Sequence, residues 1–270
     1  MGTALHDGTP VRASSGIAIT WLRAALARLP RHTHPRRMSA IFHPDSGTPD
    51  TAERIRHRRD LEMSGRPLMV LIGGATGVGK STVATRLGHA LGITRVLGTD
   101  FVREILRSVV AEALGPELSR SSFELDRDHA DGAAPHAEFE RQARQVLVGV
   151  RAEMQRAADE GTSIILEGIH LVPGLVDLHA AHDGIVVQVV LSVDDERDHE
   201  RRFHTRARSS HRPAERYDDG IGCIRALQDH AVALARTAHV PVIENRNEET
   251  TVRRLLELVS TAVSRALRAG

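Results

Sequence analysis

The sequence has very little cysteine or lysine and no long hydrophobic run. Its one cysteine, Cys223, cannot form a disulfide within the chain, and there is no cysteine cluster that could bind zinc. No apolar stretch is as long as a membrane-spanning helix, which needs about eighteen residues. The N-terminus also lacks the charged, apolar and small-residue segments that follow one another in a secretory signal. These absences predict a cytoplasmic protein that does not enter a membrane.

A strong excess of charge is also missing, because 36 basic and 35 acidic residues give a formal net charge of +1. The overall charge therefore offers no basis for binding nucleic acid or an anionic membrane. Only one of the basic residues, Lys80, is a lysine. A planar guanidinium does not replace, without cost, a compact ammonium that contacts phosphates as a point charge, so Lys80 is a functional candidate.

Residues 1–49 have the composition of a flexible N-terminal extension. They are rich in Gly, Pro, Ser, Thr, Arg and His, and no acidic residue lies between Asp7 and Asp45. The stretch Ile17–Leu29 has an amphipathic helical pattern in an arginine-rich setting, which loosely fits an organelle transit peptide. A flexible extension fits the composition better.

The remaining chain divides into a leading helix and linker, 50–66, and a main domain, 67–270. In the main domain, apolar runs of strand length alternate with longer helical patterns, which predicts an α/β fold with a parallel sheet covered by helices. We expect strands at 68–72, 94–97, 163–166, 184–192 and 240–243, and helices at 51–63, 81–91, 101–113, 139–160, 194–208, 221–238 and 250–267.

A phosphate-binding loop is the clearest motif. Residues 74–81 read GATGVGKS and match G-x-x-x-x-G-K-[ST] between an expected strand and an expected helix, whereas a chance glycine-rich turn would not need this context. Lys80 would reach the β- and γ-phosphates, and Ser81 would offer its hydroxyl to Mg²⁺. The predicted nucleotide contacts are Gly74, Ala75, Thr76, Gly77, Val78, Gly79, Lys80, Ser81 and Thr82.

The sequence lacks the motifs of two common classes of nucleotide-binding protein, the GTPases and the transporter ATPases. The guanine-reading Asn-Lys-x-Asp motif requires a second lysine, and the LSGGQ-like motif of transporter ATPases does not occur. A small-molecule kinase needs an acidic residue near the acceptor hydroxyl, cations for an anionic substrate and a mobile arginine-bearing lid. The sequence has candidates for all three.

Candidates for the acceptor site follow the second expected strand. Asp100 should lie at the carboxyl edge of the sheet, where it could act as general base or orient the acceptor, although it could also cap the following helix. Arg103 and Arg107 lie three and seven residues later, on the same helix face. Arg103 fits contact with an acceptor carboxylate or phosphate, whereas a surface role is equally open for Arg107.

Further candidates follow the third expected strand. Glu167 stands where a Walker-B-like carboxylate would influence Mg²⁺, with a capping role as the alternative. His170 lies in the next loop, and both substrate contact and a structural role are open for it.

The helix expected at 194–208 could form a lid that closes over the transferring phosphoryl group and excludes water. Its acids alternate with its bases, so a salt-bridged surface helix is the alternative. The candidate lid arginines are Arg197, Arg201, Arg202, Arg206 and Arg208.

In combination, the segments GGATGVGKST, LGTDFVREILR, ILEGIHLVPG, ERRFHTRAR and VPVIEN resemble the 2-phosphoglycerate kinase family of P-loop kinases over about residues 67–260. The resemblance implies a P-loop NTPase fold of the nucleoside-kinase-like type, with a five-stranded parallel sheet in the order 2-3-1-4-5 and a helical lid. It also implies MgATP as phosphoryl donor. By this resemblance, Lys80 and Ser81 bind MgATP, Asp100 and Arg103 face the acceptor, Glu167 and His170 border the site, Arg202 and Arg206 belong to the lid, and Asn245 approaches the adenine.

We therefore expect transfer of the ATP γ-phosphoryl group to a hydroxyl of a small anionic metabolite, with 2-phosphoglycerate as first candidate and 2,3-bisphosphoglycerate as product. A zeta-toxin-like or sugar-acid kinase would use the same residues on another acceptor. A non-catalytic ATP-sensing module is an alternative of a different class.

Overall fold

The computed structural model describes residues 51–114, 116–122, 124–125, 136–209 and 220–269. By its internal contacts the chain divides into two units, residues 1–44 and 45–270, and the described residues all belong to the second. The predicted flexible extension, 1–49, lies outside the described residues.

The second unit contains a five-stranded parallel sheet in the order β2-β3-β1-β4-β5, which confirms the order implied by the family resemblance. The two edge strands are only three residues long and begin two residues later than the sequence pattern predicts. The strands are β1 (Leu68–Gly73), β2 (Val96–Gly98), β3 (Ile164–Glu167), β4 (Ile185–Ser192) and β5 (Val242–Glu244).

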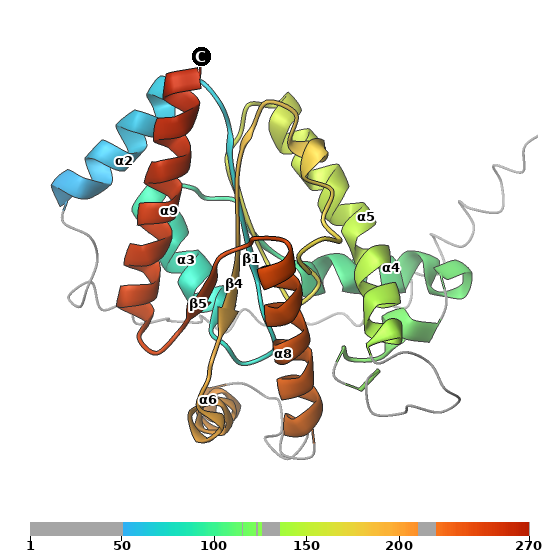
Figure 1. The fold of residues 1–270 in the computed structure, drawn as a ribbon. Helices are drawn as coiled ribbons and strands as arrows, with labels where there is room; N and C mark the ends of the chain where they lie inside the picture. Colours follow the sequence, from blue (N-terminus) through green and yellow to red (C-terminus); the bar gives the residue numbers. More distant parts are fainter. Residues whose placement is uncertain (1–50, 115, 123, 126–135, 210–219, 270) are drawn as a thin grey trace, which may run out of the picture. The chain divides into compact units, whose positions relative to one another are not determined.

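Helices cover both faces of this sheet (Figure 1). They agree with the sequence expectation to within about two residues at most ends, and α2 lies alongside α9. The helices are α2 (Thr51–Ser64), α3 (Lys80–Leu91), α4 (Thr99–Leu114), α5 (Ala137–Asp159), α6 (Glu196–Ser209), α8 (Ile221–Thr237) and α9 (Glu248–Ala269), with short 3₁₀ helices η1 (Pro116–Ser119) and η2 (Leu178–Ala181). No helix in these ranges is both long and apolar enough to span a bilayer.

The central strand β1 shows why the fold has three layers. Successive side chains of a strand point to opposite faces, and every residue of β1 is buried. Leu68, Val70 and Ile72 pack in a cluster that includes residues of α3 and α9. Met69 and Leu71 pack in a second cluster with residues of α5. The strand therefore needs apolar residues at consecutive positions. A strand with alternating polar residues would leave the helices on one face of the sheet without apolar contacts to it.

The parallel arrangement brings all five strand ends to one edge of the sheet. Ile72 of β1 pairs with Glu167 of β3, and Gly98 of β2 pairs with the same glutamate. The loops that follow these strands, and the first turns of α3 and α4, therefore meet at this carboxyl edge. Ligands of open α/β sheets bind at this edge, so the functional site is expected there.

Candidate active site

The loop between β1 and α3 has a backbone that only glycine adopts easily. Gly74, Gly77 and Gly79 have φ values of 133°, 86° and 90°. A Cβ atom would lie 2.6 Å from the ring of Phe203 if added at Gly77, and 2.6 Å from Nδ2 of Asn245 if added at Gly79. Gly79 is also the N-cap of α3, so the first N–H groups of the helix have no side-chain cap and are suited to bind an anion.

Lys80 is buried at the start of α3. Its Nζ donates a hydrogen bond to the carbonyl oxygen of Ala75 at 2.7 Å, so the loop closes around the ammonium group. The positive charge is therefore held against the loop backbone.

Ser81 and Glu167 form a polar pair beside the loop. The Ser81 hydroxyl donates to Oε1 of Glu167 at 2.7 Å, and the strand register brings the end of β3 next to the end of β1. Hydroxyl and carboxylate oxygens are the ligands that Mg²⁺ prefers. These two residues therefore fit the metal-binding positions predicted from the sequence.

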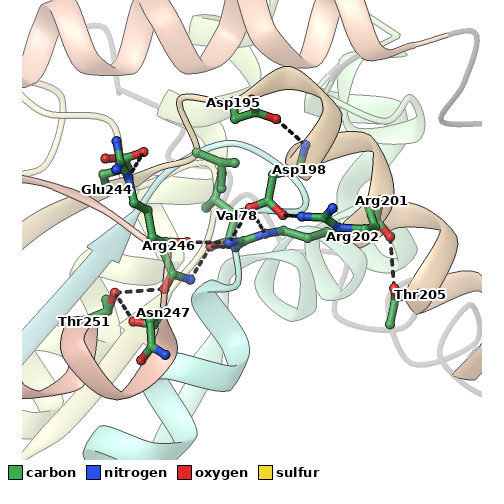
Figure 2. Close-up of polar contacts among 12 residues, drawn as sticks. Val78, Asp195, Asp198, Arg201, Arg202, Thr205, Glu244, Arg246, Asn247 and Thr251 are labelled. Atoms are coloured by element: carbon green, nitrogen blue, oxygen red, sulfur yellow. Dashed lines mark hydrogen bonds and ion pairs between the residues drawn. The ribbon is translucent and has the colours of Figure 1, made fainter.

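Helix α6 and the end of β5 hold the outer side of the loop through carbonyl groups. Nε2 of His199 lies 2.8 Å from the carbonyl oxygen of Thr76. The carbonyl oxygen of Val78 accepts hydrogen bonds from Nδ2 of Asn245 at 2.8 Å and from Nη1 of Arg202 at 3.4 Å (Figure 2). The loop is thus fixed by side chains that follow it by more than a hundred residues.

Asn245 is 1% exposed, and both polar atoms of its side chain are engaged by the protein. Nδ2 donates to Val78, and Oδ1 accepts from the hydroxyl of Thr251 at 2.8 Å. The expectation that this side chain approaches the adenine does not fit these contacts. Its amide instead links β5 and α9 to the phosphate-binding loop.

Arg202 lies between Asp198 and the loop in Figure 2. Its Nη2 is 3.0 Å from Oδ2 of Asp198, and the same nitrogen also donates to the carbonyl oxygen of Asn245. Burial raises the pKa of Asp198, but hydrogen bonds and charge from Arg201 and Arg202 outweigh it, so that pKa is lowered overall. In this arrangement Arg202 contacts the phosphate-binding loop, and its lid role stays a prediction.

The other predicted lid arginines are less informative. Arg201 is exposed and forms an ion pair with Asp198. The side chains of Arg206 and Arg208 lie outside the described residues, as do residues 210–219. The lid function of α6 therefore stays a prediction for its C-terminal half.

At the acceptor end, Asp100 lies in the first turn of α4 with 69% of its side chain exposed. Nε of Arg103 is 3.8 Å from its carboxylate, while Nη1 of Arg103 donates to the carbonyl oxygen of Leu118 at 2.8 Å. Arg107 is exposed and pairs with Glu104 at 2.8 Å. Arg103 thus ties α4 to η1 with one edge toward Asp100, whereas Arg107 takes the surface role that was its alternative.

His170 is completely buried, and direct substrate contact, one of its two predicted roles, does not fit this position. Its Nδ1 lies 2.8 Å from the hydroxyl of Thr99, and Nε2 lies 3.2 Å from Oε1 of Gln142. Burial lowers its pKa to about 4, against a smaller upward effect of Asp100. The imidazole is a neutral link between the loop after β3, the start of α4 and helix α5.

The main residue that the sequence analysis missed is His199. It is 0% exposed, and its pKa is lowered mainly by burial, opposed by the hydrogen bond to Thr76 and assisted by the charges of Arg225 and Arg202. His199, Arg202 and Phe203 are spaced three and four residues apart, which places them on one helix face. Nothing in the sequence indicates that this face packs on the phosphate-binding loop.

Comparison with known proteins adds the family. The family model described as an AAA domain matches residues 70–222. A 2-phosphoglycerate kinase from Methanopyrus kandleri is 38% identical over 78% of this chain and 66% of its own length, and one from Pyrococcus horikoshii is 39% identical over 79% and 71%. The Thermococcus kodakarensis 2-phosphoglycerate kinase is 38% identical over 78% and 73%. The chain thus spans about two thirds of the first of these relatives.

Among solved structures, the match to shikimate kinase from Acinetobacter baumannii covers 75% of this chain and 97% of that protein, with 16% identity and a TM-score of 0.42.

Proposed function

Because the chain belongs to the 2-phosphoglycerate kinase family, with an AAA domain over residues 70–222, we propose that it transfers the γ-phosphoryl group of ATP to the free hydroxyl of 2-phosphoglycerate. The observation that carries the proposal is the meeting of a phosphate-binding loop and the Asp100–Arg103 pair at one sheet edge. Relatives named for this activity make 2-phosphoglycerate the first acceptor to test.

At the nucleotide end, the loop N–H groups and Lys80 would bind the β- and γ-phosphates and stabilise the charge on the transferred group. Ser81 and Glu167 would hold Mg²⁺, directly or through its water ligands. When bound, the ion would neutralise negative charge on the phosphate groups. The 2.7 Å contact between the two side chains supports this pairing.

At the acceptor end, Asp100 would accept the proton of the attacking hydroxyl or orient that hydroxyl for in-line attack. A bond forms between the acceptor oxygen and the γ-phosphorus, and the bond from that phosphorus to the ADP oxygen breaks. Arg103 would turn its Nε edge toward the acidic groups of the acceptor. Exposure of the Asp100 carboxylate supports this role, since an acceptor can reach it.

His170 would act indirectly, by holding Thr99 and so the first turn of α4 that carries Asp100. Arg206 remains our candidate for a lid group that closes over the phosphoryl group, because it follows Arg202 by one helical turn.

The test is an acceptor panel with the full chain and MgATP, with ADP release as the readout. We expect acceptor-dependent release with 2-phosphoglycerate, and its loss in Asp100→Asn. Fast turnover of a nucleotide sugar with none of 2-phosphoglycerate would instead identify a zeta-toxin-like kinase. No acceptor-dependent release with any compound would favour an ATP-sensing module.

A further inference from the structure

Helix α6 contacts the phosphate-binding loop through two of the loop's carbonyl groups. His199 contacts the carbonyl of Thr76, Arg202 contacts the carbonyl of Val78, and Phe203 packs against Gly77. The rings of His199 and Phe203 stack with centroids 5.2 Å apart. The first two turns of α6 therefore form a brace against the loop.

The brace fixes the direction of particular peptide groups. A trans peptide is planar, so its C=O and the N–H of the next residue point in opposite directions, and no cis peptide occurs in the described part of the chain. Because His199 contacts the Thr76 carbonyl from the α6 side, the N–H of Gly77 must point away from α6. The contacts at Val78 orient the N–H of Gly79 in the same way.

The protonation of His199 supports a directional role. A carbonyl oxygen only accepts hydrogen bonds, so Nε2 must carry the proton in this contact. Nδ1 is buried and has no hydrogen-bond partner among the described residues. An unpartnered ring nitrogen is unfavourable in the interior, so packing alone does not explain a histidine at this position.

We propose that His199 is a positioning residue for phosphoryl transfer, which holds the Thr76–Gly77 peptide so that its N–H faces the nucleotide phosphates. The proposal rests on the function proposed above, because it requires ATP in the loop. It assigns nucleotide affinity to a residue that touches neither substrate. If the Gly77 N–H is already oriented, nucleotide binding does not have to order this part of the loop, and the entropy cost of binding is smaller.

The test compares His199→Leu, which removes the donor, with His199→Gln, whose Nε2 can reach the place of the imidazole Nε2. We expect the KM for ATP and the Kd for ADP to rise about ten-fold in H199L, and H199Q to restore most of the loss. The KM for the acceptor should change by less than about two-fold, since α4 is untouched. The exposed His89 on α3 gives the control variant His89→Leu, which should bind ADP like the unmodified protein.

H199N provides a second comparison if H199L does not fold, because the asparagine amide is too short to reach the Thr76 carbonyl. ADP affinity should then be weak in H199N and near normal in H199Q. Equal ADP binding by H199Q, H199N and the unmodified protein would overturn the proposal while leaving the kinase assignment intact. Failure of the unmodified protein to bind ADP would instead contradict the function on which the proposal rests.

Discussion

The two ends of the site are built differently. At the proposed nucleotide end, polar groups form hydrogen bonds with one another within the protein. The pairs are Lys80 with Ala75, Ser81 with Glu167, and Asn245 with Val78. At the acceptor end, Asp100 projects into solvent, and its closest cationic contact, Arg103, lies 3.8 Å away.

This difference indicates how each end recognises its ligand. The nucleotide end is preorganised, because its backbone geometry is held by glycines and by distant side chains. At the proposed acceptor end, the exposed Asp100 carboxylate would take its final geometry when the acceptor binds. Substitutions at the first end should therefore weaken nucleotide binding or catalysis, whereas those at the second should affect transfer alone.

Removal of the Lys80 ammonium should have the largest effect. In Lys80→Met the γ-phosphoryl group would lose the cationic partner proposed for it, and we expect kcat/KM to fall on the order of 10³-fold in a steady-state assay. Arg86→Met is the control, because Arg86 lies on the same helix in a partly exposed ion pair with Glu248. A K80M enzyme within about ten-fold of normal would contradict the assigned role.

Asp100→Asn should reduce phosphoryl transfer without reducing nucleotide binding. Phosphoryl transfer is expected to fall by about 10²- to 10³-fold, because the amide cannot accept the proton, while the Kd for ADP stays within about two-fold. Asp159→Asn is the matched control, an exposed acid at the far end of α5. If D100N weakened ADP binding as much as transfer, the two ends would not be independent.

His170 should give the protein a pH-dependent stability. Its pKa is about 4 in the folded state, so below about pH 6.5 the unfolded chain binds a proton that the folded chain does not. This stabilisation is complete above the unfolded pKa and is lost as pH falls toward 4, by up to about 3 kcal/mol.

The comparison for His170 is urea unfolding of the unmodified protein and His170→Gln between pH 7 and 4. The difference in unfolding free energy between them should become smaller, or reverse, at the acidic end. A difference that is constant across this range would show that the imidazole does not stay neutral in the fold.

Gly79→Ala should have the smallest effect of this series, on nucleotide affinity. The new Cβ would lie 2.6 Å from Nδ2 of Asn245 on a backbone with φ of 90°, and we expect the Kd for ADP to rise about ten-fold. Gly161→Ala is the control, since Gly161 also has a positive φ of 61° but nothing within 4 Å of the new atom. Equal ADP affinity in G79A and G161A would contradict a preorganised loop.

The sequence predicted the elements because their causes are local. A continuous apolar run such as Leu68–Ile72 needs burial on both faces, and the glycines and Lys80 of the loop are recognisable from spacing alone. The strand order came from the family resemblance and is confirmed.

The sequence pattern did not predict contacts between residues that are far apart in the chain. The Asn245–Val78 and His199–Thr76 hydrogen bonds join residues more than a hundred positions apart, and no periodicity encodes them. His170 shows the same limit, because its burial depends on packing against α4 and α5.

³¹P NMR of the reaction mixture is the measurement for the proposed phosphoryl transfer from ATP to a hydroxyl of 2-phosphoglycerate. We expect ADP and a second phosphomonoester resonance of the acceptor to appear in equal amounts, and both to form about 10²- to 10³-fold more slowly with Asp100→Asn. Release of ADP with inorganic phosphate, at a rate that does not change when 2-phosphoglycerate is added, would contradict the proposed transfer.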